Sequence, residues 1–171
     1  MNPRRPLPPI ETLRFLFDLD EERGLLVRAV TRAPNALKGA VVGTVDGRGY
    51  LHVNISAAFY RVHRLVFFMH YGYEPDFGID HVDCDRLNNR PSNLRPATDQ
   101  QNAGNTKPPR NNTSGFKGVY RHSRGTRWCA QIKRNGETIY LGIFDTAEQA
   151  AQAYAAAAYA HFGAYARTHN G

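Results

Sequence analysis

The chain has 171 residues, which fits one medium domain or two small ones, and its formal net charge of +7 suits a polyanionic partner without indicating a fold. No apolar window is long enough for a membrane span, and no apolar segment follows the basic start, so we expect neither a membrane partner nor a secretory signal. Two cysteines, Cys84 and Cys129, exclude a disulfide framework or a Cys-rich zinc site, so we expect a soluble protein of a reducing compartment.

The N-terminal part has the pattern of an α+β frame. Residues 1–10 are rich in proline and arginine and predict a disordered basic arm. Residues 11–17 have the apolar spacing of a short helix, and helical spacing returns at 63–71. Between them lie four strand-like segments separated by glycine and aspartate, at residues 24–30, 39–43, 50–55 and 59–62.

Acidic, imidazole and amide side chains are concentrated between residues 78 and 105. Hydrolysis of a phosphodiester needs a base that deprotonates water, a divalent cation that offsets phosphate charge, and a group that holds the base in line. These roles can be filled by Asp80, His81, Asn93 and Asn102. An Asp carboxylate with an amide oxygen suits Mg²⁺ or Mn²⁺, although each residue alone could equally serve a turn.

The helix expected after this polar stretch begins at Thr98, which can cap it, with Gln101 at the capping-box position. Beyond it the charge changes: residues 1–104 hold 13 basic and 12 acidic side chains, whereas residues 105–171 hold 9 and 3. Turn formers between 105 and 115 predict an interdomain linker. The basic run that follows is a DNA-binding candidate, and a solvated face is the alternative.

The C-terminal part alternates as a sheet should. Apolar Trp128, Ala130 and Ile132 share one face, and the other face is polar and cationic, with Arg127, Gln131 and Lys133. Asn135-Gly136 predicts a type I′ turn, and the returning strand at 138–144 should continue the apolar face with Ile139, Leu141 and Ile143. Three strands backed by a helix would leave the cationic face open to the major groove of DNA.

The helix of this C-terminal part is predicted through residues 149–162. Asp145 or Thr146 can cap its start, and Gly163 is a natural stop. Its many alanines would let it lie close to the three strands.

The order of residues from 114 to 154 resembles the AP2/ERF DNA-binding domain. The matching segments are Ser114-Gly-Phe-Lys-Gly-Val-Tyr120, Trp128-Cys-Ala-Gln-Ile132, Tyr140-Leu-Gly-Ile-Phe-Asp-Thr-Ala147 and Ala150-Ala151-x-Ala153-Tyr154. The resemblance implies groove-facing positions at Lys117, Gly118, Tyr120, His122, Gln131, Lys133, Thr138 and Tyr140. Further DNA-binding candidates in the same basic run are Arg121, Arg124 and Arg127. The AP2/ERF resemblance also implies a core position for Trp128. It implies how the domain docks on DNA, but not which DNA sequence it recognises.

The polar stretch resembles the HNH nucleases of the ββα-metal class, and specifically the homing endonucleases of phages and mobile introns. The matching segments are Ile79-Asp-His-Val-Asp83, Leu87-Asn-Asn-Arg-Pro-Ser-Asn-Leu-Arg95, Gln101-Asn102 and His63-Arg64. The resemblance implies Asp80 and Asn102 as ligands of one divalent ion, His81 as general base, and Asn93 as the residue that holds the loop and orients His81. It also implies phosphate contacts by Arg64, Arg90 and Arg95. Cys84 departs from the small residue usual there.

We therefore expect an α+β chain with an HNH nuclease domain at 11–105, a linker at 106–114 and an AP2/ERF-like domain at 115–171. The expected function is a sequence-directed, Mg²⁺- or Mn²⁺-dependent DNA endonuclease that nicks double-stranded DNA as a monomer, without a small-molecule cofactor. Its expected place is the bacterial cytoplasm or the nucleoid of a phage-infected host. Two alternatives stay open: a transcription regulator with a catalytically dead HNH-like scaffold, and a nuclease acting on RNA or on nonspecific DNA.

Overall fold

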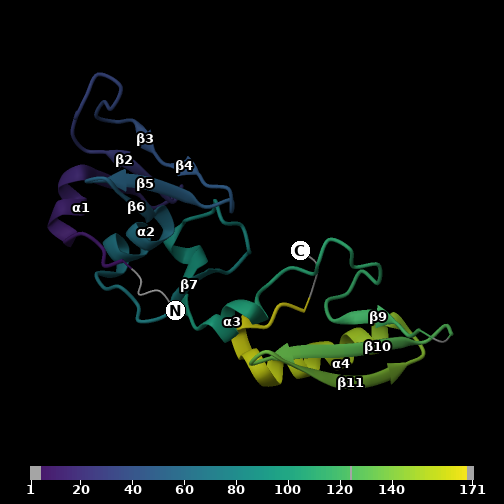
Figure 1. Cartoon of the computed structure of the whole chain (residues 1–171). Coiled ribbons are helices and arrows are strands. Elements are labelled where there is room, and N and C mark those ends of the chain that lie inside the picture. The colour runs from purple at the N-terminus through teal and green to yellow at the C-terminus, as the bar shows by residue number, and fades with distance from the viewer. Residues whose placement is uncertain (1–4, 124, 169–171) are drawn as a thin grey trace. The chain divides into compact units, whose positions relative to one another are not determined.

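The computed structural model describes residues 5–123 and 125–168 (Figure 1). These residues form two compact units that divide between Pro96 and Ala97. Of the predicted basic arm, residues 1–4 lie outside the described ranges, while Leu7 packs against the first core and the Arg5 carbonyl accepts a hydrogen bond from Arg64. Across the described ranges, no helix combines the length and apolarity that crossing a bilayer requires.

The first unit contains two helices and three small sheets. Its helices are α1 (Ile10–Leu16) and α2 (Val62–Tyr71). The strands are β1 (Phe17–Asp20), β2 (Leu25–Arg28), β3 (Val41–Val42), β4 (Thr44–Val45), β5 (Leu51–Ile55), β6 (Ala58–Arg61), β7 (Gly78–His81) and β8 (Leu94–Ala97). They pair in the orders β1-β2-β3, β4-β5-β6 and β7-β8. The predicted helices and the four predicted strands are confirmed, and β1, β4, β7 and β8 are additional.

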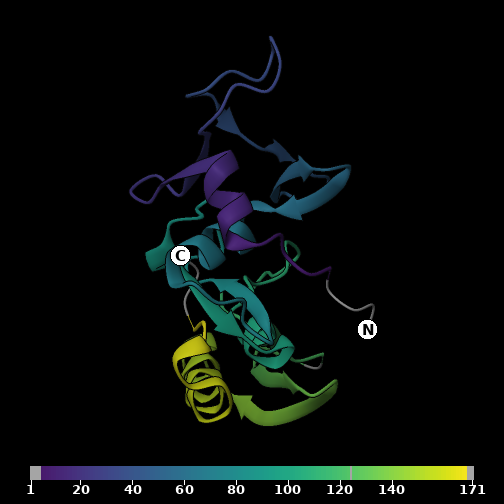
Figure 2. The same ribbon diagram turned by 90° about the vertical axis from the view of Figure 1, so that its left-hand side faces the viewer.

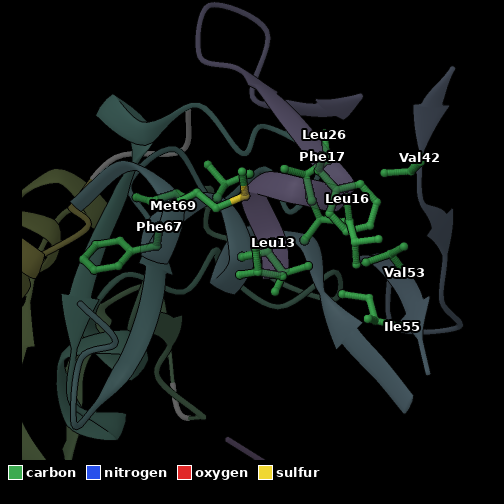
Figure 3. Packing of buried hydrophobic residues seen from close by; sticks show 13 residues of the cluster. Leu13, Leu16, Phe17, Leu26, Val42, Val53, Ile55, Phe67 and Met69 are labelled. Atoms are coloured by element: carbon green, nitrogen blue, oxygen red, sulfur yellow. The ribbon is translucent and has the colours of Figure 1, made fainter. Parts of the chain in front are cut away.

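The core of the first unit gathers around α2. Leu13 and Leu16 share one face of α1 at helical spacing, and they pack with Leu26 of β2 and with the buried side of α2 (Figure 3). Val62, at the start of α2, is fully buried in the same cluster. Each such side chain contributes roughly 1.5–3 kcal/mol through burial. This core fixes the frame that carries the β7–β8 hairpin.

The turn before β2 brings the backbone of the first hairpin close to the polar stretch. Gly24 has φ +67°, and a β-carbon there would collide with the backbone of Asn89 and Arg90. Arg23 N–H donates to Asp20 Oδ1 at 3.0 Å and stabilises the same turn. Glycine is needed here both for its positive φ and for the close approach.

The second unit is an antiparallel sheet backed by a helix. Its strands are β9 (Val119–Arg121), β10 (Trp128–Arg134) and β11 (Glu137–Phe144), paired in the order β11-β10-β9. The helices are α3 (Asp99–Gly104) and α4 (Ala147–Phe162). Short 3₁₀ turns occur at η1 (Pro91–Asn93) in the first unit and at η2 (Gly163–Tyr165) in the second. Figure 2 shows α4 beside the strands, in yellow.

Local signals in the second unit are confirmed. Thr98 and Thr146 each form a capping box, with Gln101 and Gln149 respectively, and Gly163 ends α4. At the hairpin tip Asn135 and Gly136 have φ values of +51° and +88°, as a type I′ turn requires.

The core of the second unit lies between the sheet and α4. Ala130 and Ile132 of β10 are buried, and Ala150 and Ala158 of α4 are completely buried. Because alanine adds only a methyl group, the helix approaches the strands closely. Trp128 packs against this core, as predicted.

One prediction for the returning strand is wrong. Strand β11 carries an extra residue: Ala130 pairs with Gly142, whereas Gln131 pairs with Tyr140, which leaves Leu141 unmatched. A bulge of this kind reverses the alternation of side chains. Leu141 stays in the core, but Ile143 pairs with Cys129 on the opposite face and is 38% exposed.

Helix α3 packs against α4 and η2 of the second unit. Gly104 lies against the Phe162 ring, where a β-carbon would come within 2.7 Å of Cγ. Its carbonyl accepts hydrogen bonds from Lys117 Nζ at 2.7 Å and from Arg167 N–H at 3.2 Å. The sequence prediction groups α3 with the first domain, while its contacts group it with the second unit. The predicted domain boundaries stay predictions.

Candidate functional site

Asp80 and His81 are the last two residues of β7, which pairs with β8. Both are buried, at 7% and 5% exposure. Arg95 of β8 donates to Asp80 Oδ2 from Nε at 2.9 Å and from Nη2 at 2.8 Å. A buried carboxylate needs such charge-assisted hydrogen bonds, and Arg95 supplies two of them.

The His81 ring is held by Asn89, a residue that the sequence analysis does not single out. His81 Nε2 lies 3.0 Å from Asn89 Oδ1, and Asn89 is almost completely buried. Asn89 Nδ2 donates to the Leu87 carbonyl at 3.3 Å, which turns Oδ1 toward the ring. Because Oδ1 only accepts, this hydrogen bond favours the tautomer with the ring proton on Nε2.

Asn93 fastens the loop between β7 and β8. Its Nδ2 donates to Asp83 Oδ1 at 2.9 Å and to the Asn88 carbonyl at 2.8 Å. Its Oδ1 accepts the Asp83 N–H at 3.1 Å. Asn93 therefore lies where a loop-holding residue should, while the side chain bonded to the His81 ring is Asn89. The orienting role of Asn93 stays a prediction.

Two further residues of this loop carry local signals. Burial pushes the pKa of Asp83 upward, but hydrogen bonds from the Asp85 N–H and from the amides of Asn88 and Asn93 outweigh it, so the pKa is lowered. Cys84 has φ +61°, and its N–H donates to the His81 carbonyl at 2.9 Å. The left-handed backbone explains why glycine would suit that position.

The other two predicted phosphate-binding arginines of this unit also contact protein groups. Arg64 is paired with Glu74 and donates to the Arg5 carbonyl at 3.0 Å. Arg90 donates from Nε to the Glu22 carbonyl. Together with Arg95, all three are therefore engaged within the fold.

Asn102, the other predicted metal ligand, lies on α3 and is half-buried. Asp80 belongs to the first compact unit and Asn102 to the second, so the ligand pair stays a prediction. A carboxylate is a hard oxygen donor of the kind that Mg²⁺ or Mn²⁺ prefers. Among residues 5–123 and 125–168, no cluster of three or more His, Cys, Asp or Glu could hold a metal.

The second unit presents a polar sheet face away from α4. Tyr120 and Tyr140 are 41% and 54% exposed, and Gln131 pairs with Tyr140 across the strands. Desolvation, reinforced by the Cys129 thiol, raises the pKa of both phenols, so both stay neutral hydrogen-bond donors. Exposed tyrosines on a basic sheet suit contacts to bases and phosphates.

The remaining predicted DNA-binding positions divide by environment. Those exposed on the sheet or its loops are Arg121, Arg127, Lys133 and Thr138, and His122 is half-buried. Arg121 also stacks over the Trp128 ring at 5.5 Å. Arg124 lies outside the described residues.

Lys117 and Gly118 have evident structural tasks. Lys117 Nζ donates to the Gly104 carbonyl, as described above. Gly118 has φ +71°, and a β-carbon there would collide with the Tyr154 ring and the Gln131 carbonyl. Glycine at 118 is therefore required by the packing of the sheet on α4.

Two family models match the chain. The HNH endonuclease model matches residues 60–104, and the AP2 domain model matches residues 114–164. Residues 60–104 are therefore similar to HNH endonucleases and residues 114–164 to AP2 domains, and both predicted resemblances are confirmed.

Several curated proteins are similar to part of the chain. Uncharacterized HNH endonuclease L560 of Acanthamoeba polyphaga mimivirus is 41% identical over 91 residues, covering 53% of this chain and 46% of that protein. Dehydration-responsive element-binding protein 1J of Oryza sativa subsp. indica is 39% identical over 74 residues, covering 42% and 31%. Protein 3.8 of Escherichia phage T7 is 37% identical over 59 residues, covering 34% and 49%. The chain thus spans less than half the length of each of these relatives.

A solved structure described as "DNA binding and cleavage by the HNH homing endonuclease I-HmuI" matches with 23% identity and a TM-score of 0.38. The match covers 53% of this chain and 51% of the other. At that TM-score it adds nothing to the family assignment.

Proposed function

We propose that this chain is a sequence-directed, divalent-metal-dependent DNA endonuclease of the homing type, which nicks one strand of double-stranded DNA. The observation that carries the proposal is the buried His81–Asn89 pair beside Asp80, inside the segment that matches the HNH endonuclease family. The AP2 domain on the same chain supports a DNA substrate.

In this proposal His81 is the general base. Its Nδ1 accepts a proton from the attacking water, while the Nε2–H bond to Asn89 Oδ1 keeps the ring in place and stabilises the imidazolium that forms. General base catalysis of this kind contributes about 10²- to 10⁴-fold. A divalent ion held by Asp80 would, when bound, offset the charge on the phosphate and the leaving oxygen, and the family resemblance offers Asn102 as its second ligand.

The AP2 domain would anchor the chain on a recognition sequence. Its exposed strand face carries Gln131, Lys133 and Tyr140, which can contact phosphates and base edges in the major groove. A tethered anchor raises the local concentration of the nuclease domain at its cut site. With one catalytic histidine per chain, a monomer would cut one strand at a time. Action on the nucleoid of a bacterial or phage-infected cell fits the phage and viral relatives.

The competing proposal is a DNA-binding transcription regulator with an inactive HNH scaffold, favoured by the likeness to a plant element-binding protein. Against it stand Asp80, His81, Asn93 and Asn102, because a decayed nuclease would lose at least one of them. The first three also lie in one buried, hydrogen-bonded hairpin.

The test is incubation of supercoiled plasmid with the whole chain and Mg²⁺ or Mn²⁺, beside His81→Ala and Asp80→Ala. Wild type should produce nicked circles, and His81→Ala should nick about 10²- to 10⁴-fold more slowly while still binding DNA. Absence of metal-dependent nicking would favour the regulator. Nicking at every sequence, or equal cleavage of RNA, would favour a nonspecific nuclease.

A further inference from the structure

Two arginines not predicted from the sequence lie next to the His81 ring system. Arg61 ends β6, and Arg86 lies in the loop between β7 and β8. The Cζ atoms of both lie over the Tyr50 ring, 4.2 Å and 4.8 Å from its centroid. Tyr50 in turn contacts the catalytic histidine, with ring centroids 6.1 Å apart.

A histidine completes this ring cluster. His63 of α2 is buried and lies 5.4 Å from Tyr50 and 5.1 Å from His81, measured between ring centroids. The three rings therefore form one packed group, and both guanidinium groups lie over the Tyr50 ring of that group. We call Tyr50, Arg61 and Arg86 the arginine–tyrosine clamp.

The turn before β5 fixes Tyr50. Asp46 Oδ1 accepts the N–H of Arg48 at 2.8 Å and the N–H of Tyr50 at 2.9 Å, and Asp46 N–H donates to the Tyr50 carbonyl at 2.8 Å. These bonds use the Asp46 carboxylate locally, although its charge still acts on Arg61 from a distance. The clamp is thus built on a rigid turn.

The clamp arginines differ electrostatically from the three predicted ones. Arg64 and Arg95 are ion-paired with carboxylates and Arg90 bonds to a carbonyl, whereas within residues 5–123 and 125–168 neither clamp arginine is in an ion pair. Arg86 donates to the Arg48 carbonyl, which neutralises no charge. Two cations that share one ring and form no ion pair of their own attract an anion.

We propose that the arginine–tyrosine clamp binds backbone phosphates of the DNA strand that is cut, beside the scissile bond. A guanidinium stacked on an aromatic ring keeps its N–H edge available for two parallel bonds to a phosphate, and the stacking limits the entropy lost on binding. Because His81 must lie within hydrogen-bond reach of the water that attacks the scissile phosphate, the clamp lies one ring away from that phosphate. This inference rests on the proposed nuclease function.

The experiment compares Arg61→Gln and Arg86→Gln with Arg32→Gln in the whole chain. Arg32 is an exposed arginine of the same unit, outside the site, and serves as the matched control. Nicking rates and DNA affinity are measured between 50 and 200 mM salt. Each clamp variant should lower kcat/KM about tenfold and reduce the slope of log affinity against log salt by about one, as loss of one phosphate contact predicts. Arg32→Gln should leave both quantities unchanged.

A Lys variant and a thermal melt separate phosphate binding from a structural role. Arg86→Lys keeps the positive charge but loses the planar guanidinium edge that can donate two parallel hydrogen bonds. Compared with Arg86→Gln, it should restore the salt slope and only part of kcat/KM. Clamp variants that match Arg32→Gln, or that lower the melting temperature with an unchanged salt slope, would overturn the inference while wild-type nicking persists. A wild type that nicks no DNA overturns the proposed function and the clamp with it.

Discussion

The two compact units hold their polar groups in opposite ways. In the first, Asp80, His81 and Asn93 are each less than one tenth exposed and bonded to neighbouring side chains. In the second, Tyr120 and Tyr140 are 41% and 54% exposed on an open sheet face. A reacting group must be held in one geometry before substrate arrives, whereas a recognition surface must be able to meet its partner. Substitutions should therefore change rate in the first unit and affinity or folding in the second.

The largest effect on stability is expected from Gly118→Ala, which disrupts the packing of the sheet on α4 in the second unit. The new β-carbon would collide with Tyr154 and Gln131 at a positive φ, so we expect a loss of about 3 kcal/mol in unfolding free energy. Chemical denaturation of the whole chain measures it. Gly115→Ala is the control, since Gly115 also has positive φ, at +76°, but open space around it, and should lose only about 1 kcal/mol. Equal losses would show that packing at 118 contributes nothing.

Asn89→Ala tests whether burial in the first unit serves the reaction. Without the acceptor for Nε2–H, His81 loses its fixed tautomer, and we expect kcat to fall about 10- to 100-fold with DNA affinity unchanged. Single-turnover nicking and a binding titration measure the two quantities. Asn89→Asp retains an acceptor oxygen and should recover part of the rate. A drop in affinity instead of rate would contradict the assignment.

Tyr154→Phe should change the alkaline stability of the second unit. Burial raises the pKa of Tyr154 to about 12, above the value of 10 for an exposed phenol. A raised pKa means that the neutral form stabilises the fold fully below pH 10, and that this stability is lost as the pH rises from 10 to 12. The loss should reach roughly 2 kcal/mol, measured by denaturation at each pH. In Tyr154→Phe the decline should be shallower, and an identical decline would contradict the burial argument.

The smallest effect is expected for Lys133→Ala on the open face. Losing one phosphate contact should weaken DNA affinity several-fold and reduce the salt slope by about one, with kcat at saturating DNA unchanged. Binding titrations at several salt concentrations measure the slope. Lys38→Ala, an exposed lysine of the first unit, is the control. A lower kcat for Lys133→Ala would remove the distinction between the two units.

Local chemistry was predictable from the sequence. The capping boxes at Thr98 and Thr146 and the Asn135-Gly136 turn depend on residues a few positions apart, and the structure contains all three. The family resemblances rest on ordered motifs, and they too are confirmed. The alternation of buried and outward-facing side chains along β10 is predicted correctly, because the extra residue of the bulge lies in β11.

The rest depends on contacts between distant residues. The bulge that turns Ile143 outward arises from pairing of two strands, and no residue type marks it. The ring contact of Asn89 requires the loop to fold back on β7, although the Asn-Asn pair at 88–89 was a usable signal. Tertiary packing likewise decides which arginines have carboxylate partners. Arg64 pairs with a carboxylate and Arg86 donates to a backbone carbonyl, and nothing in the sequence distinguishes the two.

The packing of α3 in the second unit determines where the AP2 domain can be exchanged in a chimaera. The HNH family match extends through residue 104, yet Gly104 is packed under Phe162 and its carbonyl is bonded to Lys117 and Arg167. A chimaera that exchanges the AP2 domain after residue 105 would leave α3 without its packing partner. The family matches alone would suggest that position, because it lies between them. An exchange at Pro96 and Ala97 would carry α3 with the domain that supports it, and Asn102 would travel as part of the transplanted module.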